Sequence, residues 1–300
     1  MAAPLRGTQS LVGQMGWVFA RPSLTVLEIA WRWFFGVPLL AVCWIEFRQI
    51  LAALPPEAAG LATLDPQNPW VAAVQLANAW TLYLPHITAV LRWLLPLAAL
   101  AWVVLSGLGR SIVLKRMDPR LRLRPLPMIA LQAAWLLALG AVGWGWFRSI
   151  QWTAATHITA TGEPDLIGYS IWVIFLSLGF FTVWALVSWA LSIAPLLMLL
   201  EERSALSSLG QSFRLGGEFS GKLAEINLVM GIVKLALIVV AMVISAAPLP
   251  FGDQLGPDAL HGIWLLATVF YLVASDYFHV VRLKSFVEFW RMFRSSKAAS

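Results

Sequence analysis

The sequence predicts an all-α integral membrane protein, a polytopic helix bundle with about six transmembrane helices and shorter amphipathic helices at the membrane interface. Of its 300 residues, 60% are hydrophobic and 12% are charged, whereas soluble domains carry about 25% charged residues. Six long apolar segments account for this imbalance, since a spanning helix needs about 20 predominantly apolar residues. No long polar stretch separates them, so we expect a single integral membrane domain covering residues 1–300.

The basic residues in the connections between these segments alternate. The connections at residues 55–85, 151–167 and 248–258 contain no Lys or Arg, whereas the other two connections and the two tails hold sixteen of the twenty-one. Lys and Arg accumulate in cytoplasmic loops of membrane proteins. The alternation therefore predicts a multi-pass protein of the bacterial cytoplasmic (inner) membrane with both termini in the cytoplasm.

The first two spans are predicted at residues 33–51 and 86–108. Residues 70–84 between them are apolar but too short to cross a bilayer, so we expect an interfacial helix on the outer side. A basic cluster follows the second span and comprises Arg110, Lys115, Arg116, Arg120, Arg122 and Arg124. These six residues favour a topological anchor and are our candidates for contacts with lipid headgroups.

The third and fourth spans are predicted at residues 127–147 and 169–200. The third is rich in Ala and Gly, which let helices approach closely in lipid. Residues 201–215 then fit an amphipathic helix on the cytoplasmic side. Its predicted apolar stripe comprises Leu206, Leu209 and Phe213.

The fifth and sixth spans are predicted at residues 224–247 and 259–281. The sixth is expected to continue into a basic amphipathic helix, residues 282–294. The apolar stripe of that helix comprises Phe286, Phe289, Trp290 and Phe293, and the flanking cations are Arg282, Lys284, Arg291 and Arg294. A basic helix with an aromatic face is typical of a membrane surface, where we expect this tail to lie.

Residues 192–215 follow a pattern seen in other membrane proteins. A Pro near the end of a span precedes an apolar run, an acidic residue and a short helix that ends with Ser and a basic residue. The matching positions are Pro195, Glu201, Ser212 and Arg214. The stretch resembles the bacterial membrane domain that accompanies some glycerophosphodiester phosphodiesterases, and related uncharacterised families. The resemblance implies a helical membrane domain without assigned activity, because the phosphodiesterase itself is a separate soluble barrel with no counterpart here.

Two ionisable residues fall within predicted spans at comparable depth, Lys234 in the fifth and Asp276 in the sixth. Charged groups inside a bilayer are costly and usually paired or functional. We expect the two side chains to form an intramembrane ion pair. A proton or substrate site, or a Lys234 that extends to the interface without contact, are the alternatives.

No pattern typical of an enzyme is present. The sequence lacks Walker A, GxGxxG, GxSxG and CxxC patterns, so we assign no catalytic residue, no cofactor and no metal ligand. The net charge of +6 lies beside apolar segments, which favours anionic lipids over nucleic acid as the partner. The sequence thus predicts a non-enzymatic scaffold or accessory subunit that contacts lipids and other membrane proteins. The alternative is a transporter or lipid-handling protein with a polar path near Lys234 and Asp276.

Overall fold

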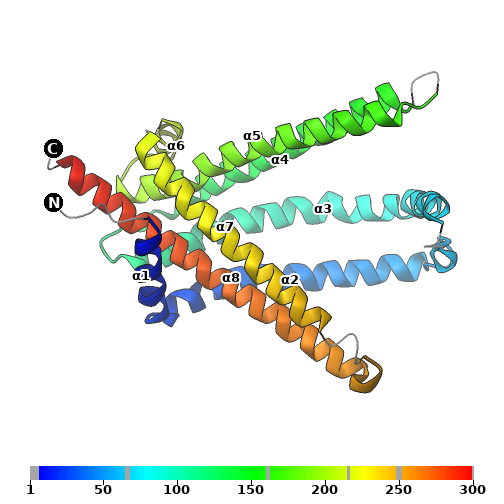
Figure 1. Cartoon of the computed structure of the whole chain (residues 1–300), viewed down its shortest axis with the longest axis horizontal. Coiled ribbons are helices and arrows are strands. Elements are labelled where there is room, and N and C mark those ends of the chain that lie inside the picture. The colour runs from blue at the N-terminus through cyan, green and yellow to red at the C-terminus, as the bar shows by residue number, and fades with distance from the viewer. Residues whose placement is uncertain (1–6, 65–67, 160–162, 215–216, 248–251, 299–300) are drawn as a thin grey trace. The chain divides into compact units, whose positions relative to one another are not determined.

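Helices account for all regular structure in the part of the chain that is described, residues 7–64, 68–159, 163–214, 217–247 and 252–298 of a computed structural model. These residues form eight α-helices, one short 3-10 helix and no strand, as Figure 1 shows. The elements are α1 Gly7–Phe19, α2 Pro22–Ala53, η1 Leu61–Thr63, α3 Pro69–Met117, α4 Pro125–His157, α5 Leu166–Leu200, α6 Ala205–Phe213, α7 Gly217–Ala246 and α8 Gly252–Ala298. The predicted all-α class is confirmed.

Six of these helices are long and apolar enough to cross a membrane. The candidate spans are Pro22–Ala53, Val71–Met117, Pro125–His157, Leu166–Leu200, Glu225–Ala246 and Gly256–Met292. Five of them contain one of the segments predicted from the sequence, and the remaining one, Glu225–Ala246, lies within the predicted segment 224–247. The chain is therefore described as a multi-pass membrane protein.

The described residues fall into two compact units. The larger unit falls within Met1–Ala30 and Gly107–Ser300, and the smaller unit is Trp31–Ser106. Helices α2 and α3 each contribute to both units. The two units are considered separately below.

The smaller unit pairs most of α2 with most of α3 through aromatic and aliphatic contacts. Trp102 of α3 lies 5.2 Å from Phe35 and 5.9 Å from Trp31 between ring centroids. At the other end, Tyr83 donates a hydrogen bond of 3.0 Å to the carbonyl oxygen of Leu54. Helix α3 contains Pro85 and Pro96, and its first turns are seen nearly end-on in Figure 1. Residues 70–84, predicted as a separate interfacial helix, are thus part of one helix with the second span, and their interfacial position stays a prediction.

In the larger unit, α4 packs against α5 and α7 packs against α8, and the two pairs are visible in Figure 1. The buried core lies toward one end of these helices. Its fully buried members include Leu24, Leu114, Met128, Met198 and Val280. This end carries the basic residues of α3 and α8, so the most extensive packing occurs at the basic end of the spans.

A glycine permits the closest helix approach in this core. A Cβ on Gly107 of α3 would lie 2.6 Å from Cγ1 of Ile129 and 2.8 Å from its Cα. Backbone cannot move aside cheaply, so no larger residue fits between α3 and α4 at this position. Gly107 thus fixes how the basic end of α3 enters the core.

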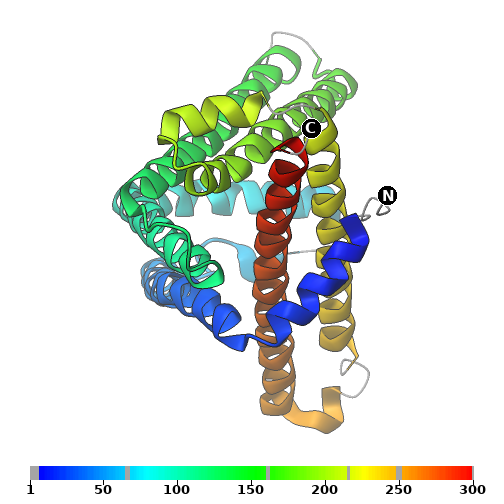
Figure 2. The same cartoon turned by 90° about the vertical axis from the view of Figure 1, so that its left-hand side faces the viewer.

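Helix α1 is an element that the sequence did not reveal. It packs across α8 and also contacts α7, as Figure 2 shows. Leu11 and Val18 are buried in the core, and Tyr277 of α8 donates a 2.9 Å hydrogen bond to the carbonyl oxygen of Met15. With 13 residues, α1 is too short to span a bilayer, so hydropathy alone does not identify it.

The tail at residues 282–294 corrects one expectation. It does continue the sixth candidate span, as predicted, because α8 is kinked only at Gly256, where that span begins, and then continues to Ala298. Three residues of its stripe, however, are buried inside the protein, with Phe286 4%, Phe289 8% and Trp290 6% exposed. The side chain of Phe293, the fourth, lies outside the described part of the chain. Lys284 is also buried, and its ammonium group lies 4.3 Å from the centroid of the Trp17 ring in α1. The described part of the stripe therefore packs against the core rather than on a membrane surface.

Helix α6, Ala205–Phe213, forms within the segment where the amphipathic helix was predicted. Of its predicted stripe, Leu209 packs against the core, whereas Leu206 and Phe213 are 83% and 58% exposed. Ser208 and Ser212 are fully buried instead. Ser208 donates to the Ser204 carbonyl oxygen and Ser212 to that of Leu209, and these bonds reduce the cost of burying hydroxyl groups.

Candidate functional site

The inner part of α8 carries a buried polar row. Asp276, His279 and Arg282 are spaced three residues apart and therefore share one helix face. Asp276 and His279 are each 5% exposed, and Arg282 is half-buried. Such a row within a candidate span is costly unless its members are satisfied by partners, which makes it a candidate site.

His279 connects this row to α2. Its Nε2 lies 3.6 Å from Oε1 of Glu28, a residue with no exposed surface, and its Nδ1 lies 3.0 Å from Nη2 of Arg282. A guanidinium only donates, so Nδ1 accepts and a neutral ring carries its proton on Nε2, facing the carboxylate. The sequence placed Asp276 and His279 on one face, but it did not link Glu28 to them.

Lys234 and Asp276, the predicted ion pair, lie on helices that pack together. Lys234 is half-buried on α7 and Asp276 is buried on α8. Helices α7 and α8 are consecutive and antiparallel, as the prediction requires. A direct ion pair between the Lys234 and Asp276 side chains stays a prediction.

A polar cleft of about 310 Å³ lies between α5, α7 and the inner part of α8. Its polar lining is Ser188, Trp189, Ser192, Asn227, Lys234 and Arg282. Two of these residues are cations and none is acidic. The cleft brings Lys234 of α7 and Arg282 of α8 to one lining, a proximity that the sequence did not predict.

The predicted basic cluster is divided between different surroundings. Lys115 and Arg116 line a basic pocket of about 560 Å³. Arg120 and Arg122 line a second depression together with Asp118, Glu202 and Arg291. Arg124 donates a 2.9 Å hydrogen bond to the carbonyl oxygen of Arg203, and Arg110 is half-buried in α3.

Ion pairs within the chain neutralise part of the positive charge at this end of the helices. Arg291 of α8 forms an ion pair with Asp118, which follows α3, and Nη1 of Arg122 lies 3.6 Å from Oε2 of Glu202. Lys284 likewise pairs with Glu288 one turn later in α8. The second depression therefore sets two acids, Asp118 and Glu202, against its three arginines, which makes it a weaker lipid site than the basic pocket.

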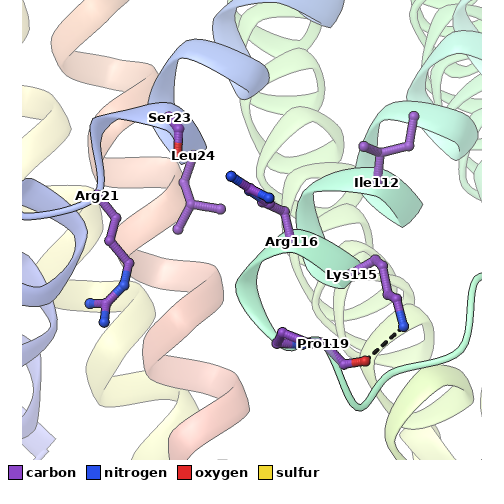
Figure 3. A pocket seen from close by; sticks show the side chains of 7 residues that line it. All are labelled: Arg21, Ser23, Leu24, Ile112, Lys115, Arg116 and Pro119. Atoms are coloured by element: carbon purple, nitrogen blue, oxygen red, sulfur yellow. Dashed lines mark hydrogen bonds between the residues drawn. The ribbon is translucent and has the colours of Figure 1, made fainter.

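The basic pocket combines the turn between α1 and α2 with the end of α3 (Figure 3). Arg21 comes from that turn, and Arg116 points from α3 toward Leu24, while Lys115 donates a 2.7 Å hydrogen bond to the Pro119 carbonyl oxygen. Arg21 also lies over the Trp17 ring, 4.1 Å from its centroid. Three cations with no acidic residue in the lining suit a phosphate-bearing headgroup. Arg21 was missed because α1, which positions it, was not predicted.

At the ends of α4 and α5 that lie away from the core, Asp165 caps the beginning of α5. Oδ1 of Asp165 accepts a 2.8 Å hydrogen bond from the backbone N–H of Gly168, and Oδ2 lies 3.3 Å from Nδ1 of His157. The Gly168 bond is the main reason that the pKa of Asp165 is lowered, and His157 adds to it. Asp165 thus caps α5 as a carboxylate and serves structure rather than chemistry.

No group of three or more His, Cys, Asp or Glu that could hold a metal ion occurs among the residues described. Comparisons with protein-family models, curated proteins and solved structures found no match. The resemblance of residues 192–215 therefore remains a prediction.

Proposed function

We propose that this chain is a non-enzymatic multi-pass membrane protein that acts as a scaffold or accessory subunit, contacting lipids and partner membrane proteins. One observation carries the proposal. In the most apolar stretch of each candidate span, at most 22% of the residues are buried within the chain, and in α5 none is. The core lies at the basic end instead. Span surfaces that the chain itself leaves uncovered are available to lipid and to other helices.

The proposed location is the bacterial cytoplasmic membrane, with the basic end and both termini in the cytoplasm. The distribution of Lys and Arg in the connections supports this orientation. The basic pocket of Arg21, Lys115 and Arg116 then faces the cytoplasmic leaflet, whose anionic lipids attract such clusters.

The best candidate surface for a partner helix is one face of α4. Leu137, Trp144 and Phe147 are exposed there, and Gly140 and Gly143 lie between them. A Cβ added at either glycine would have no atom within 4 Å. In membranes, such small residues let a second helix approach closely, and large neighbours pack around it.

Site-specific photo-crosslinking in intact cells tests this proposal. A photoreactive residue in place of Leu137 should crosslink the chain to a membrane protein in stoichiometric yield, and Gly143→Leu should abolish that product. Gly143→Leu should leave the thermal stability of the purified chain unchanged. Gly145→Leu is the matched contrast, because a Cβ at Gly145 would lie 3.0 Å from the Phe180 ring and should destabilise the α4–α5 pair itself.

The alternative outcomes are distinct. Crosslinks to lipid alone, or to residues 31–106 of this same chain, with no effect of Gly143→Leu, would contradict the scaffold proposal.

A second candidate function is that of a transporter or lipid-handling protein with a polar path near Lys234 and Asp276. The polar cleft beside Lys234 is the observation that favours it. Transport of a solute into vesicles that contain only this protein, dependent on Lys234, would favour this candidate over the scaffold.

A further inference from the structure

We propose that an apolar cavity formed by the end of α2, the connection after it and the beginning of α3 binds one acyl chain of a membrane phospholipid. The cavity has a volume of about 490 Å³ and lies entirely within the smaller unit, residues 31–106. This inference goes beyond the scaffold proposal, because it concerns a different surface and a lipid rather than a partner helix. Either of the two can fail without the other.

The connection after α2 forms one wall of the cavity. The chain turns back at Gly60, whose φ of +73° is left-handed and suits glycine. The backbone N–H of Leu61 then donates a 2.9 Å hydrogen bond to the carbonyl oxygen of Pro56, and both residues line the cavity. On α3, the hydroxyl of Tyr83, another lining residue, donates a 3.0 Å hydrogen bond to the carbonyl oxygen of Leu54. The cavity is therefore built by the fold of this unit.

The walls are suited to hydrocarbon. None of the ten lining residues is charged. The Tyr83 hydroxyl already has an acceptor, so the indole N–H of Trp80 is the remaining side-chain donor of the lining. Buried water makes about three hydrogen bonds and finds no such set of partners here. Hydrocarbon, in contrast, gains dispersion contacts along these walls.

The same lining disfavours a peptide or a helix as the occupant. An extended peptide carries backbone N–H and C=O groups that need hydrogen-bond partners inside a membrane, and this lining cannot supply them. A helix with its side chains is about 10–12 Å wide, so the cavity would hold roughly one turn of it. A single acyl chain carries no polar group and is thinner than a helix. An acyl chain therefore fits both the chemistry and the volume.

The cavity lies where acyl chains are present. Eight of its ten lining residues belong to the candidate spans Pro22–Ala53 and Val71–Met117. Ala79 and Tyr83 form its buried side, whereas Leu76 and Trp80 are more than half exposed. The exposed residues mark the side that is open to the surrounding lipid. A chain can enter there without leaving the bilayer.

The cavity differs from the basic pocket in how it treats the headgroup. No cation lines it, so an anionic headgroup gains no charge-assisted hydrogen bond there. Trp side chains are common at membrane interfaces, where the indole N–H meets polar groups. We expect the N–H of Trp80 to face the ester groups of the bound lipid. The cavity should therefore select for the acyl chain and not for the charge of the headgroup.

Photo-labelling of the full chain, purified in detergent, tests the site. The probe is a phosphatidylcholine that carries a diazirine midway along one acyl chain. We expect a saturable adduct of one probe per protein chain, on peptides that contain Leu51 or Ala79. Unlabelled phosphatidylcholine and phosphatidylglycerol should compete equally, because the lining carries no charge.

A variant that fills the cavity should remove the adduct. Ala79 lines the cavity, so Ala79→Phe should place its ring in the space of the acyl chain and reduce labelling by about tenfold or more. Ala77→Phe is the matched control. It makes the same change at an exposed position of α3 outside the lining and should leave labelling unchanged.

A second pair of variants keeps the test decisive if Ala79→Phe does not fold. Leu61→Ala removes part of the wall in the connection and leaves α2 and α3 intact. It should weaken labelling by about threefold, the equivalent of a few lost atom contacts. Leu64→Ala is the control, because Leu64 is also half-buried in the connection but lies outside the lining.

Three outcomes would contradict the proposal. Labelling that does not saturate, or that Leu61→Ala and a folded Ala79→Phe leave unchanged, would overturn the site. Competition by phosphatidylglycerol alone would overturn the assignment to an acyl chain, since it requires recognition of charge. Displacement by a free fatty acid but by neither phospholipid would overturn the phospholipid as the source of the chain.

Discussion

At the residue scale, the polar groups within the candidate spans fall into two sets with different roles. Glu28 and His279 are buried in the core, where the low polarity makes each depend on the other. Lys234 and Arg282 are half-buried and line the polar cleft between α5, α7 and α8. The first set joins α2 to α8, and the second brings two cations of different helices to one cleft.

The contact between Glu28 and His279 should show energetic coupling. We expect the free-energy changes of Glu28→Ala and His279→Ala to differ from additivity by about 0.5–3 kcal/mol in the double variant, as residues in direct contact do. Thermal unfolding of the three variants in one detergent measures this. Strict additivity would mean that the 3.6 Å approach carries no interaction.

Asp165 should titrate below the usual aspartate value of about 3.9, because its carboxylate accepts the Gly168 hydrogen bond. Since the folded pKa is depressed, the stabilisation is fully present above the unfolded pKa and is lost as the pH falls through the folded pKa. A carboxyl-carbon NMR titration should therefore give a raised value in the variant Gly168→Pro, which removes the donor and whose Cβ also displaces the Asp165 carboxylate from this position. An unchanged value would exclude the cap as the cause.

At the element scale, the sequence predicts where the spans lie in the chain. It predicts poorly which apolar side chains are buried inside the protein. A run of about 20 apolar residues identifies a membrane helix from composition alone, so all six candidate spans coincide with predicted ones. Amphipathic segments are harder, because an apolar stripe does not reveal whether lipid or protein covers it. The aromatic stripe of the predicted tail helix, residues 282–294, therefore suggested a membrane surface, whereas Phe286, Phe289 and Trp290 of that stripe are buried in the core.

The cleft and the basic pocket escaped prediction for a related reason. Each combines residues from helices that are distant in the sequence, such as Arg21 with Lys115, or Lys234 with Arg282. Only the clustering of cations after α3 was visible in the sequence. Which of those cations face a pocket, and which pair with acids, depends on packing that one sequence does not encode locally.

The burial of the α8 tail can be tested by truncating one aromatic side chain. Trp290→Ala should destabilise the protein by about 3–5 kcal/mol, because it leaves a cavity in the core. Leu206→Ala is the control, since an exposed side chain should contribute less than about 0.5 kcal/mol. Equal losses of stability in detergent would place Trp290 outside the core.

The basic pocket should concentrate anionic lipid. Each Lys or Arg near an anionic surface contributes about 1 kcal/mol, so Arg21→Ala with Lys115→Ala and Arg116→Ala should strongly reduce retention of phosphatidylglycerol. Mass spectrometry of lipids that co-purify with the chain measures this. Arg122→Ala, whose side chain pairs with Glu202, is the control and should have a smaller effect.

At the scale of the whole molecule, charge and packing coincide. In the larger unit, the core is built from α1, the α8 tail and the neighbouring ends of α3, α4 and α5, and these segments also carry Lys115, Arg116, Lys284 and Arg291. The most apolar stretches of the six candidate spans are largely uncovered by the chain itself. We propose that these uncovered surfaces hold lipids and partner helices.

The central claim is that the basic ends of the spans and both termini lie in the cytoplasm. Single-cysteine labelling in intact cells tests it most directly. In a Cys43→Ser background, Glu57→Cys and Glu163→Cys should react with a membrane-impermeant maleimide. Arg203→Cys and Ser300→Cys should react only after the membrane is permeabilised. Labelling of position 203 or 300 in intact cells, with protection of positions 57 and 163, would contradict the account.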